Sequence, residues 1–207
     1  MTEKAQPASL GKIRFALKRA SMHLPYRFPP ILALTDPVRT PDPVILAKAL
    51  PRGSGLIYRH FGAEDRHKTA LILSKIAARR KLSLLIGNDP ALALAVRAQG
   101  VHWPEANMHL ARYWKDRFTI MTCAVHSRKA IAEAKEIGMH AALLSSVFAS
   151  RSPSAGQAIG ARSFRKLARA SKLPLYALGG LNSENMGKIA EFGGIAAIDG
   201  LKPLIKP

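Results

Sequence analysis

The sequence has few of the residues that stabilise small secreted or metal-bound folds. Its single cysteine, Cys123, excludes an internal disulfide framework, and no paired spacing of cysteine and histidine is typical of a structural zinc site. No apolar run reaches the roughly 18 residues that a membrane-spanning helix needs, and the N-terminus lacks the apolar core of a signal peptide. These absences favour a cytoplasmic protein in a reducing environment, without a transmembrane segment.

Acidic and aromatic residues are also scarce. Against 32 lysines and arginines stand only 13 aspartates and glutamates, which gives a formal net charge of +19. Such a charge attracts anionic partners, among them nucleic acid, acidic membranes and phosphorylated metabolites. The basic residues are spread along the whole chain, however, and aromatic residues make up only 6% of it, which leaves few stacking platforms for bases. The pattern does not favour nucleic acid as a partner, and most of the cations are interpreted as solvated helix faces.

The length and apolar content predict one globular domain with a small appendage. The chain has 207 residues and is 48% hydrophobic, which is enough for a sizeable core. Residues 1–29 are expected to form a basic extension before a barrel domain at 30–207, and Ser9 is expected to cap a short helix within it. One side of this helix consists of Leu10, Ile13, Leu17 and Leu24. A membrane-surface or targeting helix is the alternative for this segment.

From residue 31 onward, short apolar runs alternate with helical patterns. Strands are expected at 31–35, 55–59, 83–87, 101–103, 118–125, 141–145, 175–178 and 195–198. Helices are expected at 43–50, 63–80, 90–98, 106–115, 128–137, 161–170 and 183–191. This alternation predicts an α/β fold with right-handed crossovers, a (β/α)8 TIM barrel whose final helix is truncated or missing. A doubly wound open sheet is the alternative, but the loop after the first strand lacks the glycines typical of it.

Polar residues follow nearly every predicted strand, at the end where barrels place their functional groups. Any one of them has a structural interpretation as a helix cap, a turn residue or a hydrogen-bonded histidine, but their recurrence on one rim predicts a site. Paired glycines allow a ligand to approach the backbone closely, so Gly179 and Gly180 are candidates for binding a phosphate group. The rim residues are Asp36, Arg59, His60, Asn88, Asp89, His102, Glu105, His126, Ser127, Ser145, Ser146, Gly179, Gly180, Asp199 and Gly200.

A series of short motifs gives these positions a family resemblance. In order, they are ILALTD at 31–36, GNDPALALA at 87–95, GVH at 100–102, AVHS at 124–127, SVFAS at 146–150, and LGGL at 178–181 followed by Asn185. In order and spacing the series resembles the thiamine phosphate synthase and TenI family, along nearly all of residues 31–200. The resemblance implies that Gly179, Gly180 and Gly200 bind the phosphate of a thiazole phosphate or of thiamine phosphate.

The synthases of this family couple a pyrimidine diphosphate to a thiazole phosphate and release pyrophosphate, which calls for Mg²⁺ and several cations. The segment IYRHF at 57–61 keeps Arg59 but lacks the glutamine and lysine of the family pattern. Asp89 matches one metal-binding aspartate, whereas the second falls at or near Asn107. Pro153 stands where a lysine is expected, with Arg151 close by. A divergent synthase with Asp89 as a Mg²⁺ ligand is therefore the alternative function.

The TenI branch implies the leading hypothesis, a thiazole tautomerase that moves a proton and needs no metal or other cofactor. His126 is then the proton shuttle, because an imidazole with a pKa near 6.5 can accept and return a proton at neutral pH. Arg59 is expected to meet the substrate carboxylate. The remaining pocket residues are expected to be Asn88, His102, Ser146 and Phe148.

The end of the chain keeps a third hypothesis open. After Gly200 only seven residues follow, LKPLIKP, so the helix whose N-terminus would help to hold a phosphate is missing or reduced. This loss favours a noncatalytic barrel that binds a phosphorylated ligand or regulates other proteins. A second subunit of a homo-oligomer, or the basic N-terminal helix, could fill the vacated place.

Overall fold

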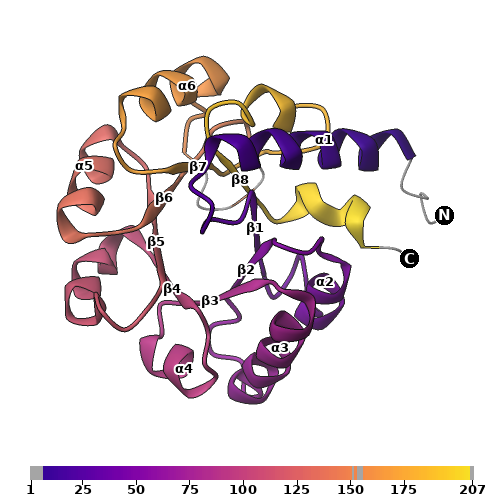
Figure 1. Ribbon diagram of the computed structural model, residues 1–207, viewed down its shortest axis with the longest axis vertical. Helices are drawn as coiled ribbons and strands as arrows, with labels where there is room; N and C mark the ends of the chain where they lie inside the picture. Colours follow the sequence, from indigo (N-terminus) through magenta and orange to yellow (C-terminus); the bar gives the residue numbers. More distant parts are fainter. Residues whose placement is uncertain (1–6, 151, 153–155, 206–207) are drawn as a thin grey trace.

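The computed structural model describes residues 7–150, 152 and 156–205. Within them, eight parallel strands close into a barrel in which each strand pairs with its neighbours in sequence and β1 pairs with β8 (Figure 1). The strands are β1 (Ile31–Leu34), β2 (Gly55–Tyr58), β3 (Ser83–Gly87), β4 (Gly100–Trp103), β5 (Ile120–Val125), β6 (Ala141–Leu144), β7 (Leu175–Ala177) and β8 (Gly194–Ala197). The predicted TIM barrel is confirmed.

Apolar side chains from the strands fill the inside of the barrel and close its amino-terminal end. Leu24 and Phe28, which precede β1, pack against this interior cluster, and the Tyr176 hydroxyl donates a hydrogen bond of 2.7 Å to the carbonyl of Pro29. The cluster consists of Leu24, Phe28, Leu32, Leu34, Ile57, Leu85, Ile120, Ala141, Leu143, Tyr176 and Ala196. Because this end is closed by packing, a ligand site has to form at the opposite, carboxyl end of the strands.

Helices of two kinds follow the strands and bury a second apolar cluster against the outside of the barrel. The α-helices after strands are α2 (Pro43–Ala49), α3 (Arg66–Arg80), α4 (Pro90–Ala95), α5 (Arg128–Ile137) and α6 (Gly160–Ala170). Asp42, Asp89 and Ser127 cap α2, α4 and α5, since each side chain accepts a hydrogen bond from a backbone amide of the first turn. Asp89 and Ser127, each two residues after the end of a strand, therefore also start the next helix.

The connections after β4, β7 and β8 contain 3₁₀ helices instead: η1 (Glu105–Trp114), η2 (Met186–Lys188) and η3 (Asp199–Leu204). The helix expected at 183–191 is thus much shorter than predicted. The side chain of Asn182 accepts hydrogen bonds from the amides of Glu184 and Asn185, and that of Asn185 accepts one from the amide of Asn182. These local bonds compete with the backbone pattern of an α-helix.

The first helix, α1 (Pro7–His23), lies along the part of the barrel wall where the chain also ends (Figure 1). It contacts β8, η2 and η3, and Ile13, Ala16 and Ala20 are fully buried beneath it. Ion pairs of Lys12 with Glu184 and of Arg19 with Glu191 join it to the segment around η2. Within the described residues, η3 is the only helix after β8, and α1 packs on the part of the barrel wall formed by β8, η2 and η3.

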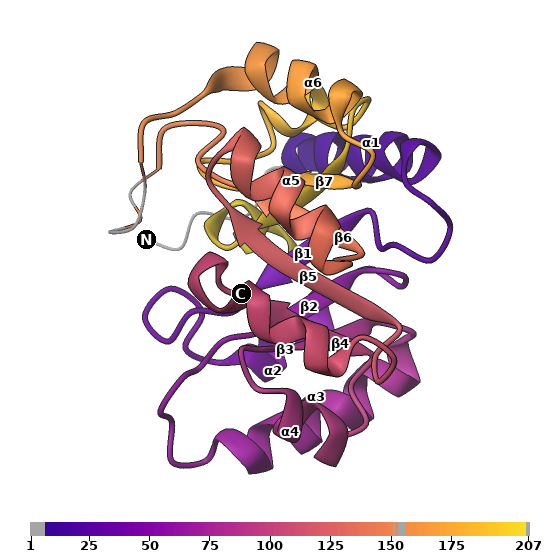
Figure 2. The ribbon, with the colours of Figure 1, turned by 90° about the vertical axis from the view of Figure 1, so that its left-hand side faces the viewer.

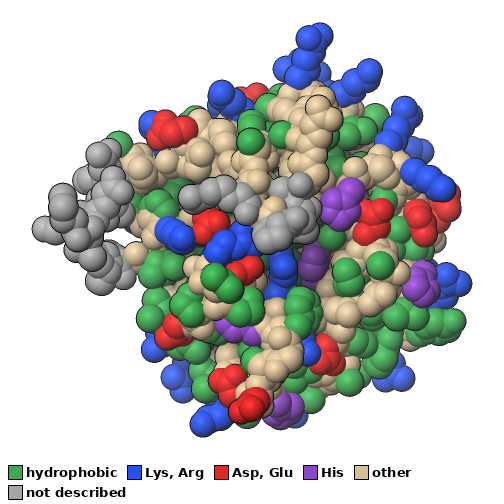
Figure 3. Space-filling model, turned by 180° about the vertical axis from the view of Figure 1, so that it is seen from behind, with side chains coloured by type: hydrophobic (Ala, Val, Ile, Leu, Met, Phe, Trp, Pro, Cys, Tyr) green, Lys and Arg blue, Asp and Glu red, His purple; other side chains and the backbone are tan. Residues whose placement is uncertain are grey.

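In Figure 2, the described residues that follow β6 and those that precede α6 extend away from the carboxyl ends of the strands. Figure 3 looks onto the face opposite to that of Figure 1, where lysine, arginine, acidic and histidine side chains gather near the centre. Within the described part of the chain, no helix combines the length and apolar character needed to cross a membrane.

Candidate functional site

A cavity of about 320 Å³ opens at the carboxyl ends of β6, β7 and β8. The residues after β1 and β2 close its other side. The polar and glycine residues that line it are Arg39, Arg59, Ser145, Ser146, Ser150, Ser152, Gly179, Gly180, Asn182, Asp199 and Gly200. The structure thus brings Arg59, Ser146 and the three glycines of the sequence-based hypothesis together around one space.

The three glycines are at positions where the backbone leaves no room for a side chain. Gly179 and Gly180 have positive φ angles of 96° and 62°, in the left-handed region that favours glycine. A Cβ on Gly180 would lie 2.2 Å from the carbonyl oxygen of Ala149, and one on Gly200 would lie 2.1 Å from that of Leu181. Among the backbone hydrogen bonds that join described residues outside the helices and strands, none is donated by the amides of Gly179, Gly180 or Gly200. Such amides at a cavity wall suit an anion.

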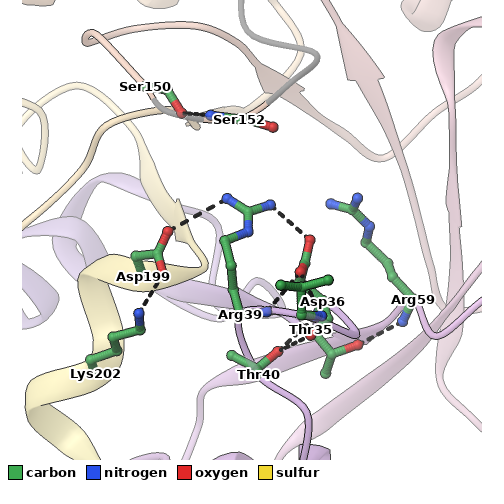
Figure 4. A network of polar contacts seen from close by, with 10 residues as sticks. Thr35, Asp36, Arg39, Thr40, Arg59, Ser150, Ser152, Asp199 and Lys202 are labelled. Atoms are coloured by element: carbon green, nitrogen blue, oxygen red, sulfur yellow. Dashed lines mark hydrogen bonds and ion pairs between the residues drawn. The ribbon is translucent and has the colours of Figure 1, made fainter.

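A network centred on Arg39 ties the loop after β1 to the residue before Gly200 (Figure 4). Nη2 of Arg39 donates to Oδ2 of Asp36 at 2.8 Å, and Nη1 lies 3.5 Å from Oδ2 of Asp199. Lys202 pairs with the other oxygen of Asp199 at 2.9 Å. The hydrogen bond from Arg39 is the main cause that lowers the pKa of Asp36 to about 2. Sequence reasoning missed Arg39; its spacing of three residues from Asp36 was the available signal.

Arg59 brings a second guanidinium to the cavity. Its backbone amide donates to Oγ1 of Thr35 at 2.8 Å, while its guanidinium makes no hydrogen bond or ion pair with any described residue. Figure 4 shows this group extended beside Asp36 and Arg39. Burial lowers the pKa of Arg59, and the charge of Arg39 acts in the same direction while Asp36 opposes it. An anionic ligand group in the cavity would relieve this unfavourable desolvation.

His102 lies in the barrel interior, below the rim. Its Nδ1 is 2.9 Å from Oγ1 of Thr122 on the neighbouring strand β5, and both side chains are buried. Burial, together with the positive charge of Arg59, lowers the pKa of His102 to about 3. The imidazole is therefore neutral at physiological pH, and the residue is not among those that line the cavity.

His126 follows β5 and is paired with an acid. Its Nδ1 lies 2.7 Å from Oε2 of Glu105, and the same oxygen accepts a hydrogen bond of 2.8 Å from its backbone amide. His126 continues the alternation of Thr122 and Ala124, so it belongs to the inner face of the sheet. Its side chain is 51% exposed and does not line the cavity as it stands. Glu105 was predicted only as a rim residue; the structure makes it the partner of His126.

Asn88 and Asp89, after β3, are already engaged in contacts within the chain. Oδ1 of Asp89 accepts from the amide of Leu92 at 2.9 Å, and Oδ2 accepts from Nη1 of Arg66 at 2.8 Å. Asn107 donates from Nδ2 to Oδ1 of Asn88 at 3.2 Å. Mg²⁺ prefers several free oxygen ligands in octahedral geometry. A carboxylate capped by an amide and a guanidinium does not fit that requirement, and the described residues contain no cluster of three metal-binding side chains.

The remaining predicted residues are on the β6 side. The amide of Phe148 donates to the carbonyl of Gly179 at 3.1 Å, and its ring packs partly buried against the outer core rather than lining the cavity. Arg151 and Pro153, which were considered in place of a synthase lysine, lie outside the described residues.

A closed barrel of eight parallel strands, with a glycine-lined cavity at the carboxyl ends of its last strands, defines the class of (β/α)8 TIM barrels. Within this class the chain belongs to the thiamine monophosphate synthase (TMP-TENI) family, whose model matches residues 36–201. A thiamine-phosphate synthase of Clostridium acetobutylicum is 30% identical over 141 residues, which are 66% of this chain and 67% of the relative. A putative thiamine-phosphate synthase 2 of Aquifex aeolicus is 28% identical over 185 residues, 86% of this chain and 98% of the relative.

A solved structure agrees with the fold. The thiamine phosphate pyrophosphorylase from Pyrococcus furiosus superimposes with a TM-score of 0.73 at 20% identity, and the alignment covers 87% of this chain and 98% of the other. This likeness supports the barrel architecture expected from the sequence, while membership of the thiamine-biosynthesis family rests on the family model and the sequence relatives.

Proposed function

We propose that this chain is a thiazole tautomerase, which binds a thiazole carboxylate phosphate and aromatises its ring by moving a proton, with His126 as the shuttle. The pairing of His126 with Glu105 is the observation that carries this proposal. A carboxylate that accepts from Nδ1 selects the tautomer in which Nε2 is free to take a proton, and it stabilises the imidazolium that results. The same imidazolium returns the proton to another ring position, so the reaction is an isomerisation without a co-reactant.

The cavity supports a substrate with two anionic groups. The amides of Gly179, Gly180 and Gly200 are suited to the phosphate, and the unpaired guanidinium of Arg59 is suited to the carboxylate on the opposite side. His126 follows β5, which pairs with β6, and the end of β6 contributes Ser145 and Ser146 to the cavity wall. Rotation of the half-exposed imidazole toward β6 would bring it over a ring held between these two anchors.

A divergent synthase is the second candidate, favoured by the names of the curated relatives and by Arg59. It requires a cation for the pyrophosphate that leaves, and Asp89 is the residue that would hold Mg²⁺. The hydrogen bonds of Asp89 to Arg66 and Leu92 speak against that role. A noncatalytic barrel that binds a phosphorylated ligand would need only the part of the cavity lined by Gly179, Gly180 and Gly200.

The deciding experiment follows the thiazole carboxylate phosphate by NMR with the purified chain, with His126→Gln, and with His109→Gln as a matched control on an exposed histidine. We expect conversion by wild type and His109→Gln, and a loss of about 10²–10⁴-fold in His126→Gln. Conversion that persists in His126→Gln would reject the shuttle.

A parallel assay supplies pyrimidine diphosphate and thiazole phosphate with and without Mg²⁺. Metal-dependent formation of thiamine phosphate, without tautomerisation, would establish the synthase instead. Binding of thiazole phosphate with neither reaction would leave the noncatalytic barrel.

A further inference from the structure

Arg66, the first residue of α3, holds a fixed position at the carboxyl end of β3. Its Nη1 donates to Oδ2 of Asp89 at 2.8 Å, and its Nη2 donates to the carbonyl of Gly87 at 2.9 Å. The guanidinium also lies over the ring of Phe61, 5.5 Å from the centroid. Its side chain is only 18% exposed. A charged group with this many anchors is part of the rim rather than a mobile surface residue.

We propose that Arg66 is a specificity residue that takes the place of a divalent cation beside Asp89 and makes ligand binding by this barrel independent of Mg²⁺. The guanidinium donates to Oδ2 of Asp89, while the amide of Leu92 donates to Oδ1. A cation that approached the carboxylate would have to displace Arg66 or accept its repulsion at short range.

The neighbours of Asp89 strengthen this exclusion. The side-chain oxygen of the preceding residue, Asn88, accepts a hydrogen bond from Asn107, so this amide oxygen is engaged as well. Mg²⁺ gives up its water shell reluctantly and binds through carboxylates that are free to coordinate it. The residues after β3 therefore offer Mg²⁺ one carboxylate, that of Asp89, and this carboxylate is already paired with Arg66.

The consequence is a preference among phosphorylated ligands. A diphosphate that needs a bridging metal finds no place for it after β3, whereas a phosphate monoester needs only the amides of the glycine side. The inference rests on the contacts of Asp89 and holds whether or not His126 transfers a proton.

Binding of Mn²⁺, used as a paramagnetic stand-in for Mg²⁺, tests the inference on the full chain by electron paramagnetic resonance. The variants are Arg66→Met, which keeps the apolar length over Phe61 but removes the charge, and Arg66→Met with Asn107→Asp, which adds a second carboxylate. We expect no saturable site on wild type, and affinity at least about tenfold higher in the double variant. Asp89→Asn in that background is expected to remove the gain.

Arg80→Met is the matched control, because Arg80 bonds to the carbonyl of Leu50 away from this rim. The inference is overturned if wild type binds Mn²⁺ and Asp89→Asn abolishes that binding, or if the double variant is folded by circular dichroism and gains nothing.

A second measurement needs no variant. Calorimetry of inorganic phosphate with wild type is expected to give the same affinity with and without Mg²⁺, and a tightening of about tenfold with the metal would overturn the inference. Neither readout depends on tautomerase turnover, so failure of one proposal remains distinguishable from failure of the other.

Discussion

Arg39 and Asp199 meet across the seam of the barrel, although 160 residues separate them in the chain. The Nη1 of Arg39 lies 3.5 Å from Oδ2 of Asp199, and Asp199 directly precedes Gly200 in the cavity wall (Figure 4). Asp199 is the first residue of the short helix η3, so its contact with Arg39 links the loop after β1 to the cavity wall around Gly200. Arg39 is therefore a positioning residue for the part of the cavity wall that contains Gly200.

Arg39→Met is expected to weaken binding of inorganic phosphate by roughly tenfold, because loss of a charge-assisted hydrogen bond costs about 1–3 kcal/mol. It is also expected to lower the free energy of unfolding by a similar amount, since the ionised Asp36 loses the hydrogen bond and the charge that stabilise it. Calorimetry and urea denaturation measure the two effects. Arg79→Met on the exposed face of α3 is the control, and equal phosphate affinity in both variants would show that the Arg39 network does not position the site.

His102 gives the fold a predictable dependence on pH. Its pKa is about 3 in the folded chain and near the ordinary 6.5 when unfolded, so between these values only the unfolded chain takes up the proton. The contribution of His102 to the free energy of unfolding is fully present above pH about 6.5. It is lost as the pH falls toward 3, by up to roughly 1.4 kcal/mol per pH unit.

His102→Gln should remove that slope, at the expense of some stability near neutral pH. Urea denaturation of wild type and variant between pH 4 and 7 measures the difference. The other titrating groups contribute to both proteins alike, so the difference between the two slopes reports His102. If the His102→Gln slope equals that of wild type, His102 is not the neutral buried group described above.

The barrel could be predicted from the sequence because its signals are local. Each strand is a short apolar run bounded by turn residues, and the observed strands lie within about two residues of the expected ones. The glycine wall was predictable for the same reason, since adjacent glycines at a strand end are unusual in themselves. Contacts between distant residues left no such signal. The partners of Asp89 and His126, namely Arg66 and Glu105, lie 23 and 21 residues away, and only folding shows which oxygens are occupied.

Gly180 provides the most direct test of the proposal that the glycines lining the cavity bind a phosphate. Gly180→Ala places a Cβ 2.2 Å from the carbonyl of Ala149 in a left-handed conformation, which by itself costs about 1–2 kcal/mol. The amides then have to shift, so we expect phosphate affinity to fall by more than about tenfold. Gly187→Ala is the control, because its Cβ would meet no atom within 4 Å. Unchanged binding in Gly180→Ala would remove this glycine from the site.

The packing of α1 predicts that it is part of the barrel's stability rather than a dispensable leader. Ile13→Ala is expected to lower the free energy of unfolding by about 2–5 kcal/mol, because Ile13 is fully buried against the barrel wall. Phe15→Ala, on the same helix but 57% exposed, should cost well under half as much. Denaturant titration of both variants measures this, and similar small losses would mean that α1 is only loosely attached.

Glu105 should matter for turnover and not for binding. In Glu105→Gln the amide oxygen can still accept from Nδ1 of His126, so the tautomer and the position of the ring are kept. The charge that stabilises the imidazolium is lost, and we expect kcat for the tautomerisation to fall by about 10–100-fold while KM stays within about twofold. Glu133→Gln on the exposed side of α5 is the matched control. A rise in KM with unchanged kcat would assign Glu105 to substrate binding, and full activity in Glu105→Gln would separate the pair from the chemistry altogether.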